Sequence, residues 1–215
     1  MPTAPAPLPD KTLVVFIALL TIHTALLIAS NAGGGKIIAL PGGLAASATV
    51  ISYMLSFIIL GAIAELFGPR HARLVVNLGL GAMAVSVVFF EVAIQLPPAS
   101  FWPHQAAYRQ VLGSSPRLLL GGWAAYLVGQ HLDIWSFFLI KRTRLGGARL
   151  WLRSWGGTLV GQLVDTAVFI TIAFAGEVPL LPAILGQYLT KLVIATLATP
   201  IVYATVGWGR AAMRR

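Results

Sequence analysis

The sequence predicts an all-α protein, a polytopic bundle of six transmembrane helices with both termini in the cytoplasm. Of its 215 residues, 58% are hydrophobic and only 10% are charged, whereas about a quarter are charged in an ordinary soluble domain. The apolar residues form runs of about 20, long enough to cross about 30 Å of hydrocarbon as helices. Because backbone facing lipid must satisfy its own hydrogen bonds, helices are the expected spanning elements.

Six apolar runs mark the predicted spans. The first follows the Pro-rich start MPTAPAPLPDK and is too long for the core of a signal peptide. The second ends at GPR, the third at LPP, the fourth begins at SPR, and the last two follow WLR and EVP. The spans cover residues 13–32, 46–67, 74–96, 116–140, 154–174 and 181–206. We expect one transmembrane domain over residues 13–208, with cytoplasmic tails at residues 1–12 and 209–215.

Lys and Arg predict the orientation, because short basic loops stay in the cytoplasm. The predicted loops on the non-cytoplasmic side hold only three basic residues, Lys36, Arg109 and Arg117. The net charge of +9 therefore reflects topology, and no nucleic-acid partner is expected. The basic residues of the cytoplasmic side are Lys11, Arg70, Arg73, Lys141, Arg142, Arg144, Arg149, Arg153, Arg210, Arg214 and Arg215.

A polar motif occurs twice inside the apolar spans, as GQHLDIWSF at residues 129–137 and GQLVDTAVF at residues 161–169. In each copy the Gln and the Asp are three residues apart and share a helix face. Counted at 1.5 Å per residue from the basic loops, Asp133 and Gln162 both lie about 12–13 Å deep, and Gln130 and Asp165 about 16–18 Å deep. If these antiparallel helices pack together, each Asp should face the other helix's Gln.

Two interpretations of these residues remain open. The simpler one is that they hydrogen-bond the helices together. The other, which we favour, is a binding site for a polar heterocycle, since carboxylates accept from ring N–H and amino groups while amides donate to a carbonyl. Lys191, midway along the last span, either neutralises one Asp or contacts the ligand. Glu65, near the cytoplasmic end of the second span, has an interfacial or a gating role.

The chain also resembles a known family. The run SSPRLLLGGWAAYLVGQHLDIWSFFLIKRTR, followed by LWLRSWGGTLVGQLVDTAVFITIAFAG, is similar to the central region of the queuosine-precursor transporters, also named the putative vitamin uptake transporter family. The resemblance implies a bacterial inner-membrane importer of 7-cyano-7-deazaguanine, its aminomethyl relative or a related purine-like base. We expect the ligand to bind between the fourth, fifth and sixth spans. The resemblance places Arg153 at the cytoplasmic mouth, and Arg153 and Glu65 are the candidates for gating or coupling. The implied substrate contacts are Gln130, Asp133, Gln162, Asp165, Thr166 and Lys191.

Other classes of function are less well supported. An intramembrane hydrolase would need a Ser beside a His, or paired metal ligands, and the four histidines are scattered. We therefore expect no enzyme, metal site or cofactor. The alternative is a substrate-binding membrane subunit for a vitamin-like ligand, energised by a separate ATPase, since the chain has no GxxxxGK[ST] loop. The expected partners are a small purine-like substrate and the lipid bilayer, and a homodimer is left open.

Overall fold

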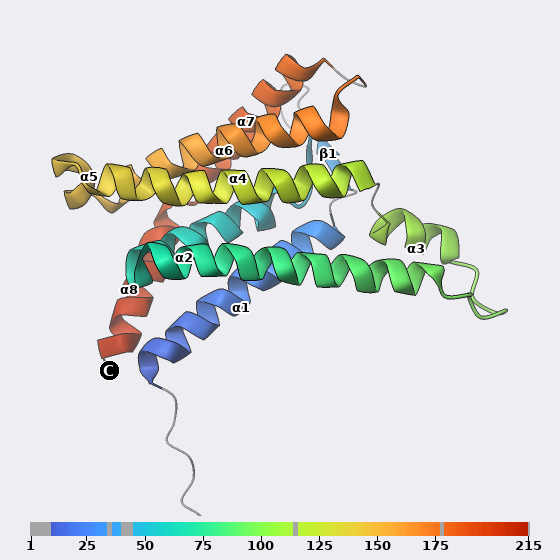
Figure 1. Cartoon of the computed structure of the whole chain (residues 1–215), viewed down its shortest axis with the longest axis horizontal. Coiled ribbons are helices and arrows are strands. Elements are labelled where there is room, and N and C mark those ends of the chain that lie inside the picture. The colour runs from blue at the N-terminus through green and yellow to red at the C-terminus, as the bar shows by residue number, and fades with distance from the viewer. Residues whose placement is uncertain (1–9, 34–35, 40–44, 114–115, 177–178, 215) are drawn as a thin grey trace, which may run out of the picture.

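The structure is a computed structural model that describes residues 10–33, 36–39, 45–113, 116–176 and 179–214. Helices make up nearly all of it (Figure 1). The exception to the all-α prediction is a short antiparallel ribbon between the first two helices, in which Ile37 pairs with Ser47. The elements are α1 (Lys11–Ala32), β1 (Ile37–Ala39), β2 (Ala45–Ser47), α2 (Val50–Gln95), α3 (Gln105–Leu112), α4 (Pro116–Lys141), α5 (Arg144–Ala148), α6 (Leu150–Phe174), α7 (Leu180–Leu197) and α8 (Thr199–Arg214).

The second and third predicted spans are the two halves of α2, which folds back on itself at Gly68. Gly68 has a φ of 83°, a conformation that glycine adopts without strain, and Pro69 follows it. His23 of α1 shows the reversal, because it touches both halves: its Nδ1 donates to the carbonyl of Ser56 (2.9 Å), and Gly79 packs against its Nε2. In a straight helix Ser56 and Gly79 would lie about 34 Å apart. The predicted loop is therefore a one-residue kink (Figure 1).

The last predicted span is divided in two at Ala198. Pro200 has no N–H to continue the helical hydrogen bonding across this point, so α7 ends at Leu197 and α8 begins at Thr199. Helix α8 continues to Arg214, so the predicted C-terminal tail is helical over its described part. Most of the predicted N-terminal tail, residues 1–9, lies outside the described residues.

Four described helices are long and apolar enough to cross a membrane: α1, α2, α6 and α7. Helix α4 has 26 residues, which is sufficient length, but Gln130, His131 and Asp133 make its second half more polar. Since α2 is a hairpin, the arrangement is compatible with six crossings. The count of six and the side on which the termini lie stay predictions.

Apolar side chains cover the outside of the bundle, and its polar side chains point inward. Phe89, Leu120 and Val193 are more than half exposed. This distribution is the one expected for a protein surrounded by hydrocarbon, where polar groups are costly outside the bundle interior. The buried polar and charged residues are His23, Ser56, Gln130, Asp133, Ser136, Arg153, Gln162, Asp165, Thr166 and Lys191. Every predicted substrate contact is among them.

Candidate functional site

The two copies of the repeated motif pack against each other through their glycines. A Cβ added to Gly129 of α4 would lie 2.6 Å from the Cβ of Asp165 on α6. A Cβ added to Gly161 of α6 would lie 2.7 Å from the Cβ of Asp133 on α4. The contact is reciprocal, so α4 and α6 cross antiparallel about a local two-fold axis, with glycine permitting the close approach. The Gln and Asp are the polar residues of the motif, whereas its Gly sets the spacing of the two helices.

We expect Gly129→Ala and Gly161→Ala each to lower the apparent Tm of the purified protein by about 5 °C, because overpacking commonly costs about 1–3 kcal/mol. Gly122→Ala is the matched control on α4, since a Cβ there would meet nothing within 4 Å. Thermal unfolding in detergent measures the difference. Equal melting temperatures for all three variants would contradict the close contact.

The predicted pairing of each Asp with the other helix's Gln is wrong, although each Asp lies within one residue of the predicted level on the facing helix. Each Asp lies opposite the glycine that precedes the other Gln. Gln130 and Gln162 are fully buried, and among the described residues neither amide has a hydrogen-bond partner for its nitrogen or its oxygen. The Thr166 hydroxyl, one turn beyond Gln162, is also buried without a partner there. Depth counting located these groups along the helices but did not predict their rotation.

Asp165 is the better satisfied of the two motif carboxylates. Its Oδ2 forms an ion pair with Lys191 of α7, and its Oδ1 accepts from the Tyr53 hydroxyl of α2 at 2.6 Å. The Lys191 ammonium also lies 5.2 Å from the centre of the Tyr53 ring. The counter-ion role predicted for Lys191 is therefore present. Asp165, Lys191 and Tyr53 form a cluster, the Asp165 cluster below, that joins α2, α6 and α7. Sequence reasoning missed Tyr53, whose phenol inside an apolar span was a signal that it needs a partner.

Asp133 has a different environment. It is 6% exposed and forms no hydrogen bond or ion pair with any described residue. Its Oδ1 lies against Gly157, where an added Cβ would be 2.7 Å away. The Ser136 hydroxyl, about one turn further along α4, is likewise buried and without a partner in the described chain. The repeated motif thus places one neutralised carboxylate and one unpaired carboxyl group on facing helices.

Glu65 gathers three cations at the end of the bundle where α2 folds back. Its carboxylate accepts from Lys141 (2.8 Å), from Arg153 (2.8 and 3.2 Å) and from Arg210 (3.0 Å). Arg153 also donates to the carbonyls of Gly146 (2.8 Å) and Gly147 (3.0 Å) in α5. This cluster, the Glu65 cluster below, links α2, α4, α5, α6 and α8. It brings together Glu65 and Arg153, the two residues predicted to act in gating.

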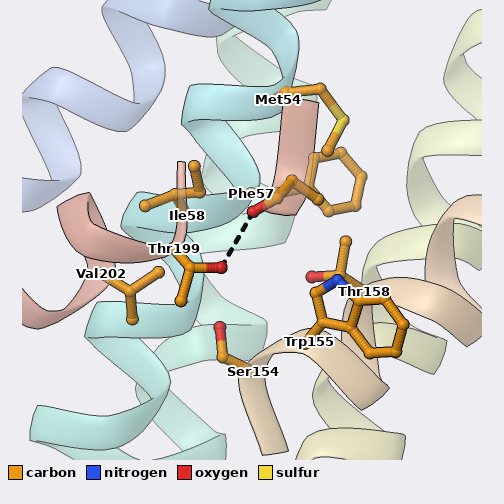
Figure 2. A pocket seen from close by; sticks show the side chains of 9 residues that line it. Met54, Phe57, Ile58, Ser154, Trp155, Thr158, Thr199 and Val202 are labelled. Atoms are coloured by element: carbon orange, nitrogen blue, oxygen red, sulfur yellow. Dashed lines mark hydrogen bonds between the residues drawn. The ribbon is translucent and has the colours of Figure 1, made fainter. Parts of the chain in front are cut away.

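A small pocket lies between the first half of α2, α6 and the α7–α8 break (Figure 2). It has room for little more than a water molecule. The hydroxyls of Ser154, Thr158 and Thr199 turn toward the same space, and that of Thr199 donates to the Ala195 carbonyl at 3.1 Å. Helix α4, predicted to line the ligand site, does not line this pocket. The lining residues are Met54, Phe57, Ile58, Ser154, Trp155, Thr158, Ala195, Thr199 and Val202.

The buried polar side chains of α4, α6 and α7 are of the types that bind polar ligands. Among the described residues no group of three or more His, Asp or Glu side chains could hold a metal ion. What the interior offers instead is carboxylate and amide oxygens, amide and ammonium donors, and hydroxyls that both donate and accept. Such a set can match several donors and acceptors on one small molecule.

Comparisons with known proteins agree with one another. The sequence profile of the family described as "Putative vitamin uptake transporter" matches residues 47–205, which include the Asp165 cluster, the pocket and most of the Glu65 cluster. A protein of Bacillus subtilis (strain 168), named "Probable queuosine precursor transporter", is 32% identical over 165 residues, covering 75% of this chain and 72% of that protein. No solved structure matches the chain.

Proposed function

Because the chain belongs to the putative vitamin uptake transporter family, we propose that it imports 7-deazaguanine precursors of queuosine across the bacterial inner membrane. The substrates are 7-cyano-7-deazaguanine and its 7-aminomethyl relative, or a closely related purine-like base. The printed name of the Bacillus subtilis relative supports this substrate class. The protein acts as a transporter without catalysing a reaction on its substrate.

The unpartnered amides are the observation that carries the proposal. A buried polar group without a hydrogen bond costs about 1–3 kcal/mol, and Gln130 and Gln162 together leave four such atoms among the described residues. A guanine-like edge presents N–H and amino donors beside a carbonyl acceptor. The amide oxygens and carboxylates can accept from the ring N–H and amino groups, and the amide nitrogens can donate to the carbonyl. Binding such an edge would therefore satisfy groups that the fold leaves open.

Transport requires that this interior site open to each side in turn. The Glu65 cluster closes the end of the bundle at which Lys141, Arg153 and Arg210 meet. Basic residues favour the cytoplasmic side, so this end is the proposed cytoplasmic gate and both termini lie in the cytoplasm. Release of the substrate then requires separation of Glu65 from at least some of its three partners.

Uptake of labelled 7-cyano-7-deazaguanine by cells unable to make queuosine precursors tests the function. We expect Gln130→Met and Gln162→Met each to reduce uptake about five- to tenfold, because each loses hydrogen bonds to the substrate worth about 1–1.5 kcal/mol in total. The melting temperature of both variants should stay the same or rise, since each removes an unsatisfied buried amide. A solely structural role predicts normal uptake.

The matched control is Gln110→Met, which changes an exposed residue of α3. It should leave uptake and queuosine in tRNA unchanged. Normal uptake and normal tRNA modification in both buried variants would overturn the site assignment. Failure of the wild-type chain to restore uptake in such cells would overturn the substrate assignment itself.

A further inference from the structure

By position along α2, α6 and α7, the residues that line the pocket of Figure 2 come between the Asp165 cluster and the Glu65 cluster. Along α6, Arg153 of the Glu65 cluster comes first, Ser154 and Thr158 of the pocket follow, and Asp165 comes about 10 Å beyond Thr158. On α7, Ala195 of the pocket lies one turn beyond Lys191. A substrate that moves along this face of α6 from the Asp165 cluster towards the Glu65 cluster therefore passes the pocket.

The pocket has hydrogen-bonding groups that the fold does not use. In the described part of the chain, the hydroxyls of Ser154 and Thr158 have no hydrogen-bond partner. In a helix such hydroxyls commonly bond to a carbonyl of the preceding turn, as Thr199 does. Two free hydroxyls turned into one space can donate to a ring nitrogen or carbonyl and accept from a ring N–H.

The walls of the pocket suit a flat ring. Phe57 is almost fully buried at the back, beside Met54, and Trp155 lines the same space from α6. Aromatic faces and a methionine thioether are favourable contacts for a planar π-system, and methionine adapts its shape to what it meets. The Trp155 indole is held by one hydrogen bond across the α6–α7 gap, to the Thr196 hydroxyl at 3.2 Å.

We infer that this pocket is a second station for the substrate, in which a flat, neutral heterocycle binds after it leaves the Asp165 cluster and before it enters the cytoplasm. Ser154 and Thr158 contact its polar edge, and Phe57 and Trp155 contact its ring. The pocket has room for about one water molecule, so binding of the base requires it to widen. This inference rests on the proposed function, because it takes the transported base as the occupant.

Single cysteines test this inference directly, because the natural chain contains none. Ser154→Cys and Thr158→Cys each place one thiol in the pocket, and a small permeant methanethiosulfonate reagent is applied to membranes. We expect both thiols to react and the reaction to block uptake. With 7-cyano-7-deazaguanine at about ten times its Kd, labelling should slow about tenfold, because only the empty fraction reacts.

Two controls flank the pocket on the same part of the chain. Arg149→Cys, at an exposed position before α6, should react equally with and without the base. Val160→Cys, 41% exposed on the outer face of α6, should leave uptake unchanged after reagent treatment.

Thr158→Val gives an independent measurement without any reagent: the loss of one hydroxyl at constant shape should reduce uptake several-fold. Thr205→Val, whose hydroxyl bonds only within α8, is its control and should have normal uptake.

The possible failures are distinguishable. If the wild-type chain does not take up the base, the proposed function fails. If the wild type takes it up but the pocket thiols are labelled at the same rate with and without the base, the second station is overturned while the transporter assignment stands. Normal uptake in Thr158→Val would likewise count against the station, irrespective of how the cysteine variants fold.

Discussion

Lys191→Met is expected to abolish uptake and to destabilise the protein strongly. Lys191 and Asp165 are both almost fully buried, and Lys191 is the one described cation that pairs with this carboxylate. Removing one partner of a buried ion pair typically costs about 3–5 kcal/mol, because the remaining charge stays without compensation. For a chain of this size the loss corresponds to an apparent Tm lower by roughly 10 °C.

A double variant separates stability from function at this pair. Lys191→Met combined with Asp165→Leu replaces both charges by apolar groups, an exchange that is often neutral or stabilising in proteins. We expect the double variant to regain most of the lost Tm and still to take up no substrate, since two of the proposed ligand contacts are gone. Lys36→Met, at an exposed position of the Gly-rich connection, is the control for loss of a lysine. If the double variant is as unstable as the single one, the ion pair does not explain the destabilisation.

Glu65→Gln is expected to have the second largest effect. Glu65 is 5% exposed and is the acceptor shared by Lys141, Arg153 and Arg210. Without its charge, three cations at the end of the bundle repel one another, and the ion pairs that join α2 to α4, α6 and α8 are lost. We expect a cost of about 3 kcal/mol and a clear loss of accumulated substrate, because the proposed cytoplasmic gate no longer closes. Thermal unfolding and uptake measure the two effects.

The loss of stability on replacing each of the three cations should increase with the burial of its side chain. Arg153 is 7% exposed, Lys141 34% and Arg210 55%. Because exposed ion pairs contribute little to stability, the stability lost on replacement by Gln should decrease in that order. Glu91→Gln is the matched acidic control, because Glu91 accepts only from Gln95 on the exposed surface of its own helix. Equal effects of Glu65→Gln and Glu91→Gln would contradict a special role for the cluster.

The helical fold was largely predictable because each span carries its own signal. Apolar runs bounded by Gly, Pro and basic residues gave the helix positions to within a few residues for α1, α4 and α6. The predicted spans differ from the structure at two points, where a single residue changes the path of the chain. Gly68 replaces a predicted loop by a kink, and the absence of an N–H at Pro200 divides a predicted helix at Ala198.

The candidate site was predictable in its residues and only partly in its arrangement. Gln130, Asp133, Gln162, Asp165, Thr166 and Lys191 are all buried polar residues inside apolar helices. Such residues are conspicuous in a sequence because polar side chains are rare there. Tyr53 and the pocket walls Phe57 and Trp155 were not conspicuous, since an aromatic residue in an apolar span is ordinary until its neighbours are known.

By itself, the sequence determined which segments are apolar enough to form spanning helices and which polar groups lie along them, and it predicted how deep each group lies. Depth follows from counting at 1.5 Å per residue along a helix, which needs no knowledge of neighbours. Only the tertiary structure decided that Asp165 meets Tyr53 and Lys191 while Asp133 meets Gly157 and Gly161. The physical reason is that a side chain's partners depend on the rotation of each helix about its axis and on which helices are adjacent, and both are set by packing between distant segments.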